Sequence, residues 1–123
     1  MAYVDGYVLP VPTKNIPAYR RIAKKAGEIW REHGALEYKE WVADDLKAEE
    51  LVPFTQCVQA KADETVIFAY IVFKSRTHRD RVNAKVMKDP CLSKMNPETV
   101  PFDCKRMAYG GFKLLVDAKA PKE

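Results

Sequence analysis

The sequence predicts an α+β protein with a ferredoxin-like βαββαβ fold, an antiparallel sheet with two helices on one face. The expected elements follow the order strand, helix, strand, strand, helix, strand, which is two split βαβ units. Residues 65–73 carry no charge and are rich in β-branched and aromatic side chains, which is typical of a strand buried on both faces. Two further segments have helical periodicity, enough to cover one face of a small sheet.

The first strand is expected at residues 3–11, where nearby prolines, which cannot donate to a strand ladder, mark its end or a sheet edge. A helix follows, with Thr13 or Asn15 available as its cap and Pro17 tolerated in its first turn. Its apolar residues recur every three and four positions, and basic residues fill the opposite face. Gly34 ends it, because glycine readily adopts the left-handed conformation that closes a helix.

A second strand is expected at residues 36–43, where apolar and polar side chains alternate until Glu40 and Trp41 break the pattern. Residues 44–64 have no firm periodicity, which is unusual within a compact domain. Within them, residues 51–58 either add a short strand or fold over the sheet, as a lid or as an irregular edge.

The second helix is expected at residues 75–88, with Ser75 or Thr77 as its cap. A loop with three prolines leads to the last strand, at residues 106–116, in which two adjacent glycines suggest a bulge or a close backbone approach. Residues 117–123 are expected to form a frayed tail.

Composition indicates one globular domain spanning residues 1–123. Hydrophobic residues make up 47% of the chain. Charged residues make up 31% and aromatic residues 11%, a composition that argues against disorder. No apolar run approaches the roughly 20 residues that span a bilayer, and the amino terminus lacks the pattern of a secretory signal, so a cytoplasmic location without a membrane partner is expected. The net charge of +4 lies mainly on a helix face without a recognition motif, so no nucleic-acid partner is expected.

The three cysteines, Cys57, Cys91 and Cys104, form no Cys-x-x-Cys pair, so free thiols in a reducing compartment are expected. A reactive role for Cys104 beside its basic neighbours is the less favoured alternative. No histidine or carboxylate group has metal-ligand spacing, so neither a metal nor a cofactor is expected.

The strand at residues 65–73 needs cover on both faces, whereas the expected helices cover only one. Burying roughly 600 Å² of apolar surface between two copies is worth on the order of 15 kcal/mol, against association costs of roughly 4–15 kcal/mol. The sequence therefore predicts a homodimer that forms through the sheet faces.

Asp5 interrupts an otherwise apolar strand, so its carboxylate must be paired, hydrogen-bonded or exposed. If Tyr7 lies opposite Gly111, Asp5 lies opposite Lys113, and a cross-strand ion pair is the main interpretation. The alternative is a polar group in a ligand cavity.

Four tyrosines lie on expected strands, where packing with a satisfied hydroxyl is the main interpretation and a pocket for a planar ligand is the alternative. Arginines near the start of the second helix and the last strand could reach such a cavity or hold an anion. The candidate ligand-binding residues are Asp5, Tyr7, Tyr38, Tyr70, Arg76, Arg106 and Tyr109.

His78 precedes Val82 and Val86 at intervals of four, so it should share their inward side. A structural histidine is the main interpretation, and a catalytic base or a metal ligand is the alternative. Asn83 is the other weak catalytic candidate, although it points about 140° away around the helix.

Several sequence blocks occur in a characteristic order between residues 3 and 116. They are Tyr3-Val4-Asp5-Gly6, Leu9-Pro10-Val11-Pro12, Trp30-Arg31-Glu32-His33-Gly34-Ala35-Leu36-Glu37-Tyr38, Lys74-Ser75-Arg76, His78-Arg79-Asp80, Asn83-Ala84-Lys85-Val86-Met87, Lys105-Arg106-Met107 and Tyr109-Gly110-Gly111-Phe112. Together they resemble the small bacterial YbaA-like family, whose function is unassigned.

This family is similar to the dimeric α+β barrel superfamily, so the resemblance implies two ferredoxin-like sheets that face each other with the helices outside. It carries no established chemistry. We expect a homodimer of unassigned role with a small-molecule cavity between sheet and helices. The alternative, by analogy with the superfamily, is an enzyme: a cofactor-independent monooxygenase or a haem-degrading oxygenase that would use Asn83, Trp30 or Trp41, and His78.

Overall fold

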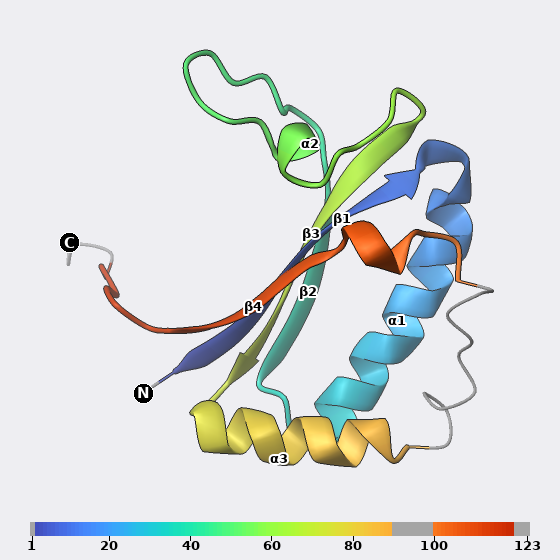
Figure 1. Cartoon of the computed structure of the whole chain (residues 1–123). Helices are drawn as coiled ribbons and strands as arrows, with labels where there is room; N and C mark the ends of the chain where they lie inside the picture. The colour runs from blue at the N-terminus through green and yellow to red at the C-terminus, as the bar shows by residue number, and fades with distance from the viewer. Residues whose placement is uncertain (1, 90–99, 120–123) are drawn as a thin grey trace.

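A computed structural model describes residues 2–89 and 100–119. In this part of the chain, four strands form an antiparallel sheet in the order β2-β3-β1-β4, and two long helices lie against one face of it (Figure 1). The ferredoxin-like α+β fold is therefore confirmed. The elements are β1 (Tyr3–Pro12), α1 (Ile16–Glu32), β2 (Glu37–Val42), α2 (Phe54–Cys57), β3 (Glu64–Phe73), α3 (Arg76–Met87) and β4 (Ala108–Lys113).

β3 lies between β1 and β2, as its uninterrupted apolar sequence predicts. Alternate side chains, from Ile67 to Phe73, are buried against the helices together with Leu9 and Val11 of β1. The other face carries no long helix. Phe68 is 47% exposed there, and its cross-strand neighbour Trp41 is 51% exposed.

α1 begins after Asn15, but the Asn15 side chain does not cap it. Its Nδ2 instead donates to the carbonyl of Pro101 at 3.1 Å, which ties the start of the helix to the segment before β4. Gly34 follows the helix with φ of +116°, so the predicted glycine stop is correct.

α3 begins after Ser75, whose Oγ accepts a hydrogen bond from the backbone N–H of His78 at 3.1 Å. Of the two expected caps, the structure therefore selects Ser75. Thr77 lies one residue inside the helix.

The irregular segment after β2 folds over the helix-free face of the sheet and adds the single turn of α2 rather than a strand. The ring of Phe54 stacks on Phe68 at 6.4 Å, and Val58 is buried. A short strand at residues 51–58 is thus wrong: a helical turn places Phe54 over Phe68 and buries Val58, while Leu51 and Val52 remain exposed.

The register of β4 differs from the expected one. Tyr7 lies opposite Tyr109 and Asp5 opposite Gly111, so the predicted Asp5–Lys113 ion pair is wrong. The pairing is regular, without a bulge, and Gly111 makes room for a ring: a Cβ there would lie 2.2 Å from the hydroxyl oxygen of Tyr3.

The strand ends at Lys113 rather than at residue 116, although the N–H of Leu114 still donates to the carbonyl of Ala2 at 3.1 Å. Residues 117–119 of the expected tail have no regular structure, and the rest of the tail lies outside the described residues, as do Pro90, Cys91 and Pro97. No helix in the described ranges is long and apolar enough to cross a membrane.

Candidate functional site

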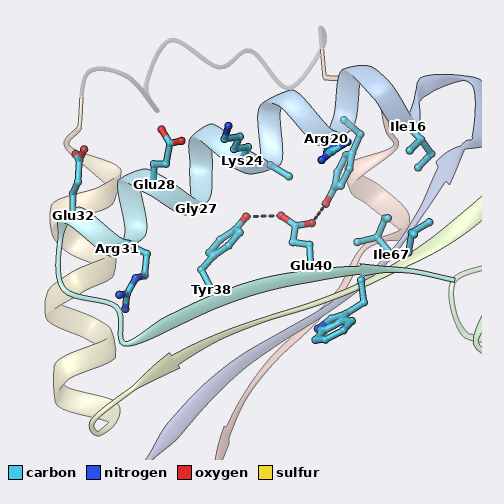
Figure 2. A pocket seen from close by; sticks show the side chains of 14 residues that line it. Ile16, Arg20, Lys24, Gly27, Glu28, Arg31, Glu32, Tyr38, Glu40 and Ile67 are labelled. Atoms are coloured by element: carbon cyan, nitrogen blue, oxygen red, sulfur yellow. Dashed lines mark hydrogen bonds between the residues drawn. The ribbon is translucent and has the colours of Figure 1, made fainter.

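A carboxylate and two phenols meet between α1 and β2. Glu40 accepts a hydrogen bond from the hydroxyl of Tyr38 at 2.5 Å through one oxygen and from the hydroxyl of Tyr19 through the other (Figure 2). Tyr38 and Glu40 come from β2 and Tyr19 from α1. The three side chains thus join the edge of the sheet to the helix above it.

Tyr19, Tyr38 and Glu40 line two neighbouring cavities. The outer one, about 770 Å³, is a groove between α1 and the β2 edge (Figure 2). The inner one, about 220 Å³, lies deeper between α1 and the sheet and is mostly apolar. The residues common to both are Tyr19, Ala23, Tyr38 and Glu40.

Local sequence explains why these side chains converge. Tyr38 and Glu40 are two positions apart on a strand, so both face the helices. Gly27 lies opposite Tyr38 in α1, where a Cβ would come within 2.7 Å of the tyrosine ring. A glycine inside a helix costs roughly 1 kcal/mol relative to alanine, and here it allows the ring to pack against the helix backbone.

Burial raises the pKa of the Tyr19 and Tyr38 hydroxyls far above the usual range, and the nearby negative charge of Glu40 adds to the effect. Burial likewise raises the pKa of Tyr7, which lines the inner cavity. The tyrosines therefore remain neutral donors at physiological pH.

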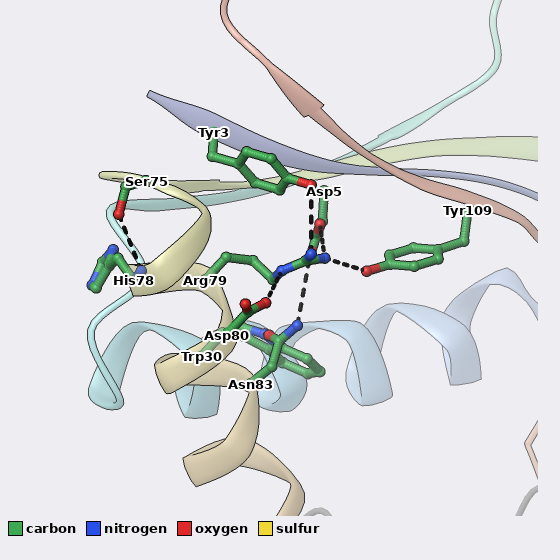
Figure 3. A network of polar contacts seen from close by, with 9 residues as sticks. All are labelled: Tyr3, Asp5, Trp30, Ser75, His78, Arg79, Asp80, Asn83 and Tyr109. Carbon is green, nitrogen blue, oxygen red and sulfur yellow. Dashed lines mark hydrogen bonds and ion pairs between the residues drawn. The ribbon is translucent and has the colours of Figure 1, made fainter. Parts of the chain in front are cut away.

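A second polar network occupies the other half of the same helix–sheet layer. Asp5 is fully buried, and its Oδ1 accepts from Nη1 of Arg79 on α3 at 2.9 Å (Figure 3). The guanidinium also donates to the hydroxyls of Tyr109 at 2.9 Å and Tyr3 at 3.4 Å, and to Asp80 at 2.8 Å. Its carbon lies 5.0 Å from the centre of the Tyr3 ring.

Burial raises the pKa of the Asp5 carboxyl, while the charge of Arg79 and hydrogen bonds from its neighbours oppose the rise. Asn83 contributes to this balance with a 3.5 Å hydrogen bond to Oδ2. Every buried side-chain polar atom in the described ranges has a partner, so this network is a closed structural link between α3 and the sheet.

The predicted ligand-binding residues do not form one group. Tyr38 lines both cavities and Tyr7 the inner one. Tyr109 stacks on Tyr7 with ring centres 5.0 Å apart and joins the Arg79 network together with Asp5.

The other three candidates lie elsewhere. Tyr70 is on the helix-free side, where its hydroxyl donates to Glu37 at 3.3 Å. Arg76 is exposed on α3. Arg106 makes a bidentate pair with Glu64, with both distances 2.7 Å.

Of the side chains proposed for an oxygenase, only Asn83 and Trp30 are hydrogen-bonded to each other in the described residues. Asn83 accepts from Nε1 of Trp30 at 3.1 Å, whereas Trp41 is on the opposite face of the sheet. His78 faces the Phe73 ring and accepts the backbone N–H of Lys74 through Nδ1 at 2.9 Å. Burial lowers the pKa of His78, consistent with a neutral, structural imidazole.

The described residues contain no cluster of three or more histidine, cysteine or carboxylate side chains arranged to hold a metal ion. Cys57 and Cys104 are free and exposed.

Sequence reasoning missed Tyr19 and Glu40 as site residues. Tyr19 falls within the apolar stripe of a helix and reads as core. Two signals pointed to the cluster: Glu40 occupies an inward position of a strand beside Tyr38, and Gly27 lies in the middle of a helix. Neither signal says that the helix places a second phenol against the same carboxylate.

The fold places the chain among ferredoxin-like proteins. A NIPSNAP domain protein from Burkholderia xenovorans matches with a TM-score of 0.55 and 12% identity, covering 98% of this chain and 99% of its own. Rv0793 from Mycobacterium tuberculosis matches with a TM-score of 0.57 and 12% identity, covering 97% of this chain and 100% of its own. A dimeric ferredoxin-like protein from an uncultured marine organism matches with a TM-score of 0.53 and 9% identity, covering 98% of this chain and 100% of its own. At these identities the likeness concerns the fold alone.

The chain belongs to the family described as "Protein of unknown function (DUF1428)", whose model matches residues 2–104. The "Uncharacterized protein YbaA" of Escherichia coli K12 is 41% identical over 117 residues, which is 95% of this chain and 99% of that protein. The protein of the same name from Shigella flexneri matches to the same extent. The resemblance to the YbaA-like family is therefore confirmed.

Proposed function

We propose that the protein binds a small organic molecule in the space between α1 and the sheet, and that it does so as a homodimer. The observation that carries the proposal is the pair of cavities that meet at Tyr19, Tyr38 and Glu40. Protein interiors are ordinarily close-packed, with few voids larger than a water molecule. Mostly apolar walls with a few converging polar groups are typical of ligand sites.

Filling the junction of the cavities tests this binding. Ala23 lines both cavities, so Ala23→Phe should occupy the space that a ligand needs. Ala84 is exposed on α3, so Ala84→Phe adds the same ring outside the cavities. The neutral fluorescent probe N-phenyl-1-naphthylamine should bind the wild type and Ala84→Phe equally and bind Ala23→Phe at least about tenfold more weakly.

Equal binding of the probe to all three proteins would place it outside the cavities and overturn the proposal. So would the lack of any saturable signal with the wild type. Thermal unfolding of each variant verifies that the added ring has not disrupted the fold.

The helix-free face of the sheet supports the homodimer. Trp41, Phe68 and Phe112 are each about half exposed on this face, at 51%, 47% and 59%. An exposed apolar patch of this kind usually marks an interaction site. One structural relative is a dimeric ferredoxin-like protein, which favours the same arrangement here.

A charge in the middle of this face should separate the two copies. In sedimentation equilibrium, the wild type should have twice the 14.1 kDa mass of the chain, and Phe68→Asp should have the mass of one chain. Leu115→Asp is the matched control, because Leu115 is 93% exposed beyond β4. A wild type that sediments as a single chain at micromolar concentration would contradict the dimer.

A further inference from the structure

Five aromatic rings contribute to the wall of the inner cavity, beside aliphatic side chains. Tyr7, Tyr19, Trp30, Tyr38 and Phe102 all belong to its wall. Trp30 and Tyr38 have ring centres 6.1 Å apart at 35°, and Tyr19 meets Phe102 edge-on at 5.4 Å. These rings come from α1, from two strands and from the segment before β4, so folding gathers them around one small volume.

Among the described residues of this lining, Glu40 is the only acidic residue, and none is basic. The tyrosines beside it stay neutral because burial raises the pKa of their hydroxyls. The ion pairs of residues 2–89 and 100–119 include none to Glu40. Its partners are two neutral phenols, which stabilise a carboxylate through hydrogen bonds but leave its charge uncompensated.

Where the structure describes the chain, basic side chains line the outer groove, whose wall also includes Glu40, but not the inner cavity. Arg20, Lys24 and Arg31 line that groove together with Glu28 and Glu32, so its own charges are mixed. The Arg31 guanidinium is engaged by the backbone carbonyls of Ala35, at 2.8 Å, and Leu36. Among residues 2–89 and 100–119, no lysine or arginine forms an ion pair with Glu40.

We propose that the inner cavity takes a small organic cation, an alkylated ammonium, held by Glu40 and the faces of Trp30 and the surrounding tyrosines. This inference rests on the proposed function, since it names the class of ligand for that cavity. A partly buried carboxylate favours a positive partner. Aromatic faces attract the same charge, and cages of rings are a known solution for alkylated ammonium ions. An anionic ligand would meet the carboxylate, and the described residues of the inner wall include no cation to oppose the repulsion.

The test uses a pair of ligands with nearly the same shape and different charge. Choline carries a trimethylammonium group, and 3,3-dimethylbutan-1-ol has a neutral carbon in place of the nitrogen. Titrated into the dimer and followed by NMR chemical shifts, choline should bind about tenfold or more tightly than the alcohol.

Two variants, each lacking one negative charge, test whether the preference for choline depends on Glu40. Glu40→Gln keeps a polar group beside the phenols but removes the charge, so the preference for choline should disappear. Glu49→Gln removes the same charge from an exposed loop position and should leave the preference unchanged.

Each contrary result has a distinct meaning. If the wild type binds the two ligands equally, or Glu40→Gln keeps the preference, the cation assignment is overturned. If choline does not bind while N-phenyl-1-naphthylamine still distinguishes the wild type from Ala23→Phe, the cation assignment is wrong and small-molecule binding stands. If the probe also fails, the proposed function falls with it.

Discussion

Asp5 and Glu40 are acidic residues on the same face of one sheet, yet their surroundings differ in kind. Asp5 lies beneath α3, fully buried, and an arginine neutralises it. Glu40 lies beneath α1 at the β2 edge, hydrogen-bonded by two phenols and bordered by two cavities. Both carboxylates have hydrogen-bond partners, but only Asp5 has a counter-ion among the described residues.

The difference separates structural charge from charge that is available to a ligand. A buried ion whose partner is part of the chain completes the fold, and removing that partner leaves an uncompensated charge. A carboxylate that is hydrogen-bonded only by neutral groups and borders a cavity can still attract an external cation. The two cavities follow the same division, because Glu40 lies in the walls of both and Asp5 in neither.

The largest effect is expected at Asp5. Arg79→Met removes the counter-ion of Asp5 and should lower the free energy of unfolding by about 3–5 kcal/mol. Urea denaturation at neutral pH measures it. Arg76→Met, an exposed change on the same helix, should stay within about 0.5 kcal/mol of the wild type.

Adding Asp5→Asn to Arg79→Met should restore part of the lost stability, because no uncompensated charge remains. A loss below about 1 kcal/mol for Arg79→Met alone would break the comparison, since it would show that Asp5 does not depend on its counter-ion.

An intermediate effect is expected at a third carboxylate. The Arg106 side chain, with its two hydrogen bonds, holds the pKa of Glu64 at about 2, below its ordinary value of 4.5. Because the folded-state pKa is lowered, the stabilisation is complete above pH 4.5 and is lost as the pH falls towards 2. Glu64→Gln should therefore melt roughly 2–5 °C below the wild type at pH 7, with the gap closing near pH 2.

Calorimetric melting curves of both proteins between pH 2 and 7 follow this gap, and Glu49→Gln is the control without an arginine partner. A gap that stays constant across the titration would mean that the Glu64 charge does not contribute through Arg106.

The smallest effect is expected at Glu40. Glu40→Gln removes a charge that has no cationic partner in the described structure, so the free energy of unfolding without ligand should change by less than about 1 kcal/mol. Urea denaturation beside Arg79→Met gives the direct contrast. A loss of about 3 kcal/mol or more would make Glu40 a structural charge like Asp5 and remove the basis for a cation site.

Most of the architecture was predictable because it depends on local patterns. The run at residues 65–73 fixed the strand that became β3, and glycine at position 34 marked the end of α1. Register was harder: β4 pairs two residues away from the expected alignment, which moved the partner of Asp5 from Lys113 to Arg79. The alternation of side chains is the same in both alignments, so the sequence does not distinguish them.

The candidate site was less predictable. Of the candidate ligand-binding residues, Tyr7 and Tyr38 lie in cavity walls, whereas Tyr70 faces the other way and Arg106 is paired. Periodicity says which side of an element a residue takes. It does not say which residues of another element lie opposite, and that decides whether a polar group finds a partner.

The amino-acid sequence by itself determined the element types, their order and the apolar character of both faces of β3, because helix and strand periods and glycine conformations act within a few residues. Only the tertiary structure decided that Asp5 pairs with an arginine, whereas Glu40 is hydrogen-bonded by two phenols and borders two cavities. Asp5 and Arg79 are 74 residues apart, and Tyr19 and Glu40 are 21 apart. Such neighbours are set by how α1 and α3 pack on the sheet, which no local pattern encodes.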